Sequence, residues 1–297
     1  MLYIATLIQE FVDMNKNSKP KTWFHYYWQS LSGRIGFVIL LILIIGALCS
    51  LFHLLPYNPL AQDPLAIIKG PSWHHLFGTD QFGRDIFSRV LDGLRRSLSV
   101  SLVAVFLATL FGMLFGVTAG YFGGFLDTVA VRMSDIFFAF PAILLALAIV
   151  SALGHTWIDT SLAIAIVYTP IFVRVTRGPV LSLKELDYIK ATKVLGFSTR
   201  RILWKHILPN IMPVLLVQVA LSLSWAILTE SGLSFLGLGT QAPDASLGLM
   251  VADAQPLVSF AWWTLAAPSL FLMLSVVSLN LVGDGLRDSL DPTRKSI

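Results

Sequence analysis

The residues with the strongest claim to a function are basic and lie in one segment. This segment, DYIKATKVLGFSTRRILWKHILPN (Asp187–Asn210), holds five Lys or Arg residues against one Asp, yet it lies between two long apolar runs. A loop that joins two such runs needs only a few residues. A positively charged anchor would explain the charge but not the length, so the segment is predicted to bind a partner rather than to catalyse a reaction.

The turn chemistry of the segment predicts a helix, a tight turn and a second helix. Gly196 is suited to end the first helix in the left-handed conformation. Ser198 or Thr199 can cap the second helix through its hydroxyl, and Pro209 lies where the next apolar run begins. The second helix is expected to point Ile202, Leu203 and Ile207 inward and Arg200, Arg201 and Lys205 outward. The expected product is a rigid knob.

Glu230 is a second candidate because it is an ionisable residue at the far end of an apolar run. It follows Pro209 by 21 residues, which is about 32 Å of helix. An acidic group at that depth is a candidate for a transport pathway or an interface, and a salt bridge at a helix end or between chains is an equally good interpretation. Arg132 and Asp135, three residues apart, are predicted to pair with each other.

Motifs for catalysis or metal binding are absent from the sequence. There is no G-x-x-x-x-G-K-[ST] stretch for nucleotide phosphates, no G-x-S-x-G elbow and no H-x-x-x-H or C-x-x-C spacing. His74 and His75 are adjacent, so their side chains would not converge on one ion. Catalytic, cofactor and metal residues are therefore not expected. The net charge of +4 is spread around apolar runs, which argues against nucleic acid as a partner.

The composition indicates the elements that must hold these residues. Of 297 residues, 56% are hydrophobic and 13% are charged, about half of the charged share that is usual in soluble domains. A charge-free run of about 20 residues can cross a bilayer. Such runs are Ile35–Leu55, Ser97–Leu126, Ile136–Ile158, His206–Thr229 and Ala254–Gly283. A sixth run, Thr160–Val173, is shorter, but Arg174 and Arg177 can extend their stems to the headgroups; the alternative is a re-entrant or interfacial helix.

The sequence therefore predicts an all-α polytopic membrane protein with six transmembrane helices. The expected spans are residues 35–55, 98–122, 132–154, 158–178, 209–231 and 262–284, within a transmembrane domain of 35–285 that follows an N-terminal segment, 1–34, and precedes a tail, 286–297. Residues 1–13 contain two acidic residues and no basic one, so a cleavable signal peptide is not expected.

Local patterns add detail to three of these spans. Gly112, Gly116 and Gly120 recur every fourth residue and should let another helix approach the second span closely. Kinks are predicted at Pro141 and Pro170, in the third and fourth spans. The segment before the second span is predicted to form an amphipathic helix, with Ile86, Val90 and Leu94 as its apolar stripe and Arg84, Asp85 and Arg89 opposite.

The distribution of charge predicts the orientation of the chain. With six spans, both termini lie on one side, and that side holds 16 of the 21 Lys and Arg residues. Basic loops stay in the cytoplasm. Both termini and the knob are therefore predicted to be cytoplasmic.

At the basic segment the sequence resembles the membrane subunits of bacterial ABC importers. Their signature reads E-A-A, three residues, Gly, nine residues, I-x-L-P. Aligned on Gly196, this chain matches at Ala191, Leu208 and Pro209 and departs at three positions, with Lys190 for Glu, Thr192 for Ala and His206 for Ile.

Further blocks resemble the second permease of the dipeptide/oligopeptide/nickel importers. They are LLPYNPLAQDP, HLFGTDQFGRDIFSRVL, GYFGGFLD, HILPN, SGLSFLGLGTQAP and LVGDGLRDSLDP. The resemblance implies a type I importer permease fold in a bacterial inner membrane, without enzymatic activity of its own. It implies four kinds of partner: a sister permease that completes the path, two cytoplasmic ATPases, an extracytoplasmic solute-binding protein and the lipid bilayer. The coupling loop would contact the ATPase through Lys190, Ala191, Thr192, Gly196, Ser198, Arg200, Arg201, His206, Leu208 and Pro209.

The leading hypothesis is thus a permease that carries di- or oligopeptides. A nickel or metal-chelate permease of the same family is the chief alternative, because the two groups share all these blocks. A stand-alone secondary transporter would need charged residues within the spans to relay ions, and the spans hold almost none. A membrane scaffold or sensor is the third interpretation.

Overall fold

The computed structural model describes residues 23–290, and within this range its regular structure is entirely helical. The helices are α2 (Trp23–Gln29), α3 (Leu31–Leu51), η1 (Pro64–Ala66), α4 (Ile86–Phe122), α5 (Gly124–Phe138), α6 (Ala142–Leu153), α7 (Trp157–Leu183), α8 (Asp187–Val194), α9 (Thr199–Ile202), η2 (Leu203–Ile207), α10 (Leu208–Phe235), α11 (Leu247–Ala254), η3 (Gln255–Leu257) and α12 (Trp263–Leu290). The expectations about a signal peptide and about the end of the tail fall outside the described residues.

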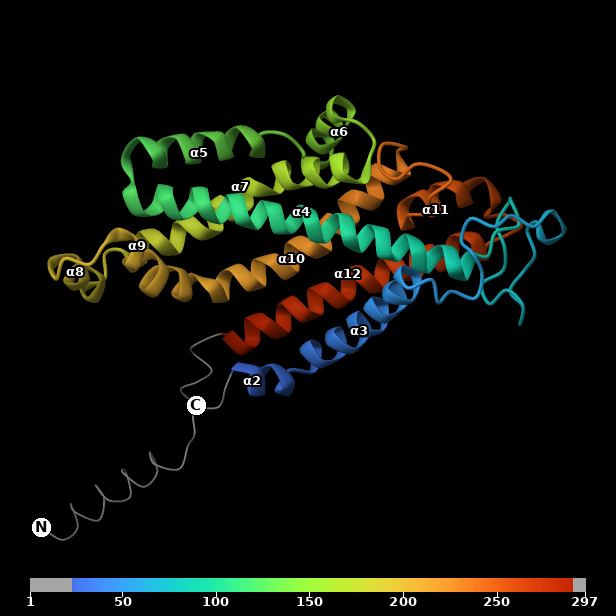
Figure 1. Ribbon diagram of the computed structural model, residues 1–297, viewed down its shortest axis with the longest axis horizontal. Helices are drawn as coiled ribbons and strands as arrows, with labels where there is room; N and C mark the ends of the chain where they lie inside the picture. The colour runs from blue at the N-terminus through green and yellow to red at the C-terminus, as the bar shows by residue number, and fades with distance from the viewer. Residues whose placement is uncertain (1–22, 291–297) are drawn as a thin grey trace, which may run out of the picture.

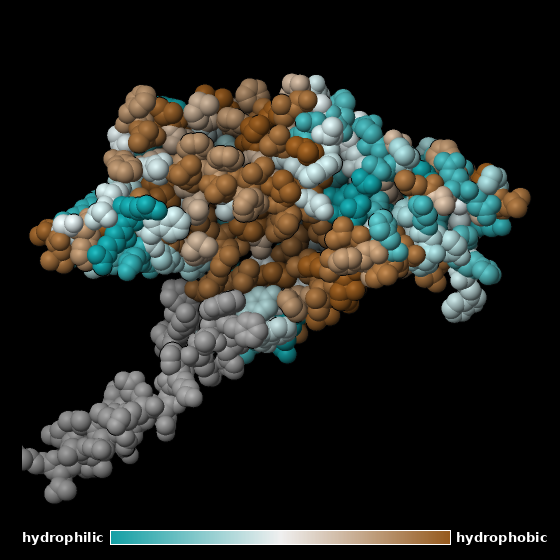
Figure 2. Space-filling model, in the orientation of Figure 1, coloured by the Kyte–Doolittle hydropathy of each residue, from teal (hydrophilic) through white to brown (hydrophobic). Residues whose placement is uncertain are grey.

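The long helices form one bundle with a knob at one end and a cap at the other (Figure 1). We define the knob as residues 187–207 and the cap as residues 52–85 and 236–262. Five helical stretches are long and apolar enough to cross a membrane: α3, α4, α7, Thr199–Phe235 and α12. Figure 2 shows apolar residues over the middle of the bundle and hydrophilic ones gathered toward its two ends. This distribution is typical of a protein whose middle lies in lipid.

The third predicted span is a bent pair of helices rather than one rod. α5 and α6 meet at 95° across a break of three residues, and Pro141 stands immediately before α6. Proline has no backbone N–H to continue the helix and restricts the residue before it, so the predicted kink at Pro141 is confirmed. Pro170 lies inside α7, which continues through it as one helix, so the kink expected there stays a prediction.

Most of the other spans extend beyond their predicted limits. α4 begins at Ile86, twelve residues before the predicted position 98, because the apolar stripe of Ile86, Val90 and Leu94 is buried and continues directly into the span. α7 continues to Leu183, α12 to Leu290, and α10 to Phe235. α3 is an exception in that it lies four residues earlier than predicted, over Leu31–Leu51.

Close packing between α4 and α7 is made by the predicted glycine stripe. A Cβ atom placed on Gly116 would lie 2.7 Å from the carbonyl oxygen of Val173 and 2.8 Å from Cβ of Thr176. Gly112 and Gly120 meet α7 in the same way, one turn on either side. The prediction that these residues admit another helix is therefore confirmed.

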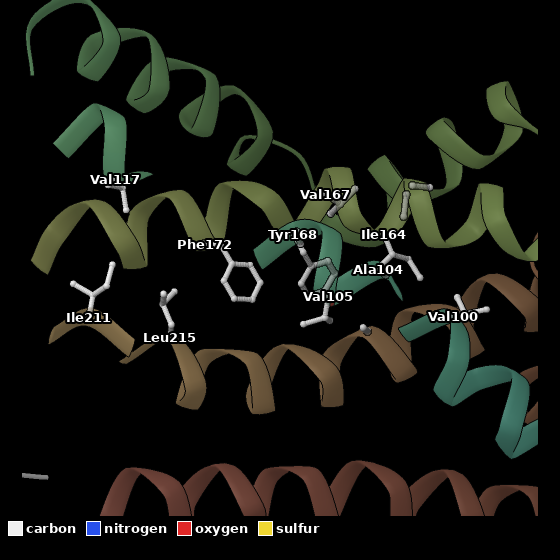
Figure 3. Close-up of a cluster of buried hydrophobic side chains, with 14 of the residues drawn as sticks. Val100, Ala104, Val105, Val117, Ile164, Val167, Tyr168, Phe172, Ile211 and Leu215 are labelled. Carbon is white, nitrogen blue, oxygen red and sulfur yellow. The ribbon is translucent and has the colours of Figure 1, made fainter. Parts of the chain in front are cut away.

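The main core lies where α4 and α7 meet α10. Figure 3 shows Phe172 and Tyr168 of α7 pointing toward α10, with Val105 of α4 and Leu215 of α10 beside them. Phe172 is fully buried, and the hydroxyl of Tyr168 lies 3.0 Å from that of Thr229. α10 is thus held by the α4–α7 pair along much of its length.

Two ion pairs connect α5 to α7. Arg174 Nη2 donates to Asp135 Oδ1 at 2.6 Å, and Arg177 Nη2 donates to Asp127 Oδ2 at 2.7 Å. The prediction that Arg132 pairs with Asp135 is therefore wrong. Arg174 lies on a packed neighbouring helix, a relation that spacing along one helix could not reveal.

The cap buries charges that were predicted to lie on a polar face. Asp85 caps α4 by accepting from the backbone N–H of Ser88 at 2.8 Å. The Arg89 side chain is only 2% exposed, and its Nη1 donates to the carbonyls of Pro59 at 3.1 Å and Pro243 at 3.4 Å. The two parts of the cap fold over the first turns of α4, and main-chain carbonyls take the place of water around the guanidinium.

Asp253, near the end of α11, makes the stability of the folded chain depend on pH. It lines a cavity of about 20 Å³ together with Arg84 and Arg89. Burial raises the pKa of its carboxyl above the ordinary 3.8, although the two arginines act in the opposite direction. The folded chain therefore holds this proton more tightly than the unfolded chain. The contribution of Asp253 to stability is present below pH 3.8 and is lost as the pH rises through the raised pKa.

Replacing Asp253 by asparagine is expected to remove the loss of stability that accompanies a rise in pH. The Asp253→Asn variant should unfold at a higher temperature than the unchanged protein at pH 7 and at about the same temperature at pH 3. Thermal unfolding in detergent, recorded across this range, measures the difference. A variant that is less stable at pH 7 would show that attraction to the arginines outweighs the cost of burial.

Candidate functional site

The first half of the knob ends in a glycine motif that matches the sequence prediction. α8 stops at Val194, and Gly196 has a φ of +76°. The N–H of Phe197 donates to the carbonyl of Thr192 at 3.1 Å, and the N–H of Gly196 donates to that of Lys193 at 3.0 Å. These two bonds form a Schellman motif, in which glycine adopts the left-handed conformation at little cost.

The second half of the knob is continuous with α10. Ser198 is the N-cap of α9, and its Oγ accepts from the backbone N–H of Arg201 at 3.4 Å. α9 leads into the π-helical turn η2, where the N–H of Leu208 donates to the carbonyl of Leu203. Pro209 follows without a break, so Thr199–Phe235 is a single helical stretch of 37 residues. A π turn shifts the hydrogen-bond pattern just before a proline that cannot donate.

Apolar side chains seat the knob on the bundle. Ile189, Ile202 and Ile207 are fully buried and belong to the main core, as predicted for the last two. Lys184, just before the knob, donates from Nζ to the carbonyl of Gly120 at 2.8 Å, near the end of α4. Lys193 Nζ lies 4.9 Å from the centre of the Tyr121 ring. The knob therefore moves with α4 and α10 rather than as a loose loop.

The knob, at the end of the bundle opposite the cap, exposes apolar side chains (Figure 1). Val194 is 88% exposed, Leu195 72% and Trp204 65%. Arg200 and Arg201 lie on the same knob and are also exposed. An exposed apolar surface with basic neighbours, at an end of the bundle where hydrophilic residues gather, is typical of a docking surface for another protein.

The structure brings the predicted coupling residues together in the knob and at its junction with α10. Lys190, Ala191, Gly196, Ser198, Arg200, Arg201 and Pro209 are exposed, His206 and Leu208 are half-buried, and Thr192 is buried. Lys190, which stands where the importer signature has Glu, lies 3.2 Å from Glu185 in an exposed ion pair. Val194 and Trp204 were missed. The signal for them was an apolar residue next to a helix-ending glycine or between basic residues.

Glu230 lies at the other end of α10, near the cap. It is 1% exposed, and its carboxylate accepts from the hydroxyls of Ser234 at 2.8 Å and Ser231 at 3.4 Å. The hydroxyl of Ser97 in α4 is buried beside it without a hydrogen bond of ordinary geometry. Among the described residues Glu230 has no ion pair, so the carboxylate is surrounded by hydroxyls of its own chain.

Replacing Glu230 tests whether the carboxylate serves mainly to satisfy these serines. Glu230→Leu leaves their buried hydroxyls without an acceptor and should cost about 1–3 kcal/mol. Glu230→Gln keeps an acceptor and removes a buried charge that has no cation, so it should be at least as stable as the unchanged chain. Unfolding temperatures in detergent measure both. Equal loss in the two variants would show that the charge itself is required.

Comparison with known proteins places the chain among transport components. The family described as "Binding-protein-dependent transport system inner membrane component" matches residues 112–296. The chain is 43% identical over 276 residues to the dipeptide transport system permease protein DppC of Alkalihalophilus pseudofirmus, covering 92% of this chain and 91% of the relative. It is 41% identical over 281 residues to the di/tripeptide transport system permease protein DppC of Pseudomonas aeruginosa, covering 91% and 92%.

A solved structure has a similar fold at much lower identity. It is a chain of the MetNI methionine ABC transporter in inward-facing conformations, with a TM-score of 0.55 and 17% identity. The match covers 68% of this chain and 96% of that one. The shared part shows the type I importer fold, in agreement with the predicted fold class.

Proposed function

The chain belongs to the family of binding-protein-dependent transport system inner membrane components, and on that premise we propose that it is the permease subunit of an ABC importer for di- and oligopeptides. It forms one half of the translocation path, and a sister permease forms the other half. ATP is hydrolysed on two separate cytoplasmic subunits, and an extracytoplasmic solute-binding protein delivers the peptide. The peptide crosses without covalent change.

The observation that carries this proposal is the knob. The knob lies at the end of the bundle, beyond its apolar middle (Figures 1 and 2), yet it exposes the apolar side chains of Val194, Leu195 and Trp204. In the proposed orientation the knob lies in water beyond the lipid, and another protein that docks there would bury these side chains. A cytoplasmic ATPase fits because the knob also presents Arg200 and Arg201, which pair well with carboxylates.

The proposed orientation places the knob and both termini in the cytoplasm of a bacterium and the cap outside its inner membrane. The excess of Lys and Arg on the knob side supports this orientation. Reporter fusions after Gly70 and after Lys193 test it. Activity of a periplasmic reporter is expected only after Gly70, and activity after Lys193 would invert the assignment.

The helix Thr199–Phe235 provides the coupling between ATP and the path. It begins in the knob and extends through the bundle as one piece of 37 residues. When the ATPases close on ATP, they displace the knob. Because α10 is continuous with the knob, it then tilts relative to the neighbouring helices. Access to the path then alternates between the two sides of the membrane.

A peptide is favoured over nickel as the substrate. The relatives described above are named for dipeptide and di/tripeptide transport. Within residues 23–290 no group of three or more His, Cys, Asp or Glu side chains is arranged to hold a metal ion.

Reconstitution tests the function as a whole. The chain is assembled in liposomes with its sister permease, both ATPases and the binding protein, and uptake of labelled alanyl-alanine is compared with uptake of Ni²⁺. Alanyl-alanine uptake is expected with ATP and not without it. Uptake that persists without any ATPase would remove the importer proposal, and ATP-driven uptake of Ni²⁺ alone would replace the peptide by a metal.

A further inference from the structure

Two hollows near the cap share a pair of adjacent arginines. One hollow of about 560 Å³ lies beside the start of α7 and the chain after α10. Another of about 580 Å³ lies beside the end of α3 and the chain that follows it. Arg95 and Arg96 of α4 line both of them. Neither arginine belongs to the knob or to the buried serine group around Glu230.

Two aspartates organise the arginines into a four-residue group, which we call the paired-charge cluster: Asp92, Arg95, Arg96 and Asp244. Arg96 donates from Nη1 and Nη2 to the two oxygens of Asp244 at 2.9 and 2.8 Å. It also donates from Nε to Asp92 at 3.1 Å, while Arg95 Nη2 donates to Asp92 at 2.8 Å. The cluster carries two positive and two negative charges.

Both an arginine and an aspartate of the cluster can still form hydrogen bonds to a ligand. Within the described part of the chain, Nη1 of Arg95 has no hydrogen-bond partner, while Nε and Nη2 are both engaged. The side chain of Asp244 is 41% exposed, and those of the two arginines are 28% exposed. A ligand in the hollows can therefore accept from an arginine and donate to Asp244 without breaking the pairs already present.

The cluster lies near the cap, where the helices leave the apolar part of the bundle. Ser50, which accepts from Arg95 Nε at 3.3 Å, is one residue from the end of α3. Trp157, the first residue of α7, lines the same hollow as Asp244. A solute that approaches from the cap side meets these charges before it reaches the apolar middle.

We propose that the paired-charge cluster binds a free peptide by its two charged ends as the peptide passes from the binding protein into the path. The carboxylate is held by Arg95 and Arg96, the ammonium group by Asp244, and the peptide body lies in the hollow beside Trp157. This proposal rests on the proposed function, since it names the site that the imported solute meets.

Size and charge both favour a zwitterionic peptide over a simple anion or cation. Small-molecule sites usually measure about 300–1,000 Å³, and the hollow of about 560 Å³ falls in this range. Arginine pairs with a carboxylate through two parallel hydrogen bonds. A lone anion would leave Asp244 facing it, and a lone cation would face both arginines, so a ligand with both charges uses the cluster best.

The first experiment asks whether a peptide lies in the hollow. The assembled transporter, without binding protein, is irradiated with an alanyl dipeptide that carries a diazirine on its second side chain. Cross-links are expected within residues 155–157 and 240–244. Asp244→Asn should weaken labelling about tenfold, a loss of about 1.4 kcal/mol in binding. For the N-acetylated peptide, which lacks the ammonium group, the same variant should change labelling little. Labelling elsewhere, or equal loss for both peptides, overturns the proposal.

The second experiment asks whether the site serves transport. Arg96→Gln with Asp244→Asn removes one bidentate pair and leaves no unmatched charge between the two positions. With the full set of subunits and the binding protein, the number of peptides carried per ATP should fall about tenfold, while the loaded binding protein still stimulates ATP hydrolysis. The matched control, Arg174→Gln with Asp135→Asn, neutralises an ion pair between α5 and α7 that lies outside the cluster and should carry peptide at the unchanged ratio.

The outcomes separate this site from the proposed function. If stimulation of ATP hydrolysis falls together with uptake, the cluster docks the binding protein, and the peptide site is wrong. If neither quantity changes, the cluster is outside the path and the proposal is also wrong. If the unchanged transporter shows no ATP-driven uptake, the proposed function fails, whereas cross-links to the hollow that depend on Asp244 would still support a peptide site.

Discussion

ATP-driven uptake is expected to fall at least about a hundredfold when Val194 and Leu195 are both replaced by aspartate. Each side chain is mostly exposed at the tip of the knob, and covering such a side chain with a partner contributes about 1.5–3 kcal/mol. Loss of both contributions corresponds to about 3–6 kcal/mol, and a factor of ten in affinity corresponds to about 1.4 kcal/mol. Two unpaired carboxylates in the interface would add a further cost.

The measurement combines uptake with recovery of the ATPases in co-purification. Both should be lost in Val194→Asp with Leu195→Asp. The matched control is Ser182→Asp with Asn210→Asp, which adds the same charge at exposed positions beside the knob without removing an apolar side chain, and it should keep both. If the aspartate variant does not reach the membrane, Val194→Ser with Leu195→Ser replaces it. Full retention of the ATPases by either tip variant would refute the docking role.

Replacement of Gly116 by leucine is expected to destabilise the bundle more than any other single change considered above. The carbonyl of Val173 and Cβ of Thr176 already occupy the space of its Cβ, and both are fixed by the backbone of α7. One extra methylene in a packed core costs about 1–3 kcal/mol, and leucine adds four carbons. We therefore expect a loss above about 3 kcal/mol and little folded protein.

Gly178 supplies the matched comparison on the partner helix. It also lies inside a helix, but a Cβ at this position would meet no atom within 4 Å. Gly178→Leu should keep or raise the unfolding temperature, because glycine inside a helix costs about 1 kcal/mol relative to better helix formers. Thermal unfolding in detergent compares the two variants. Similar loss in both would mean that the contact between α4 and α7 at Gly116 does not cause the effect.

Local patterns in the sequence predicted local structure well. The Gly196 turn and the glycine stripe of α4 depend on neighbours within a few residues or on one helical face, and both are present. The stripe of Ile86, Val90 and Leu94 was correct for the same reason. Pro141 was correctly predicted to bend the third span, but the 95° angle depends on how α6 packs against α7 and α10.

Contacts between distant parts of the chain could not be predicted in this way. Arg96 and Asp244 are 148 residues apart, and no spacing rule connects them. Asp135 was assigned to Arg132 because the two are close on one helix, yet it pairs with Arg174 on α7. Arg89 was placed on a polar face because the sequence does not reveal that the cap folds over it.

The candidate docking surface shows a related limit. An apolar residue in a membrane protein can face lipid, the core or water, and these three environments have the same sequence pattern. Val194 and Trp204 were therefore overlooked beside the more visible arginines. Only the position of the knob, beyond the apolar middle of the bundle, identifies their exposure as significant.

The π turn η2, the last part of the knob, also determines the direction in which the side chains of α10 point relative to the rest of the knob. A π turn holds one residue more than the α-helical turn it replaces, and each residue of an α-helix turns the chain by about 100°. Deleting one residue from η2 would rotate every side chain of α10 by about that angle relative to the knob. The inward face of Ile202 and Ile207 and the inward face of Ile211 and Leu215 could then no longer be buried together. A five-residue turn thus fixes the direction of the docking face relative to the face of α10 that packs against α4 and α7.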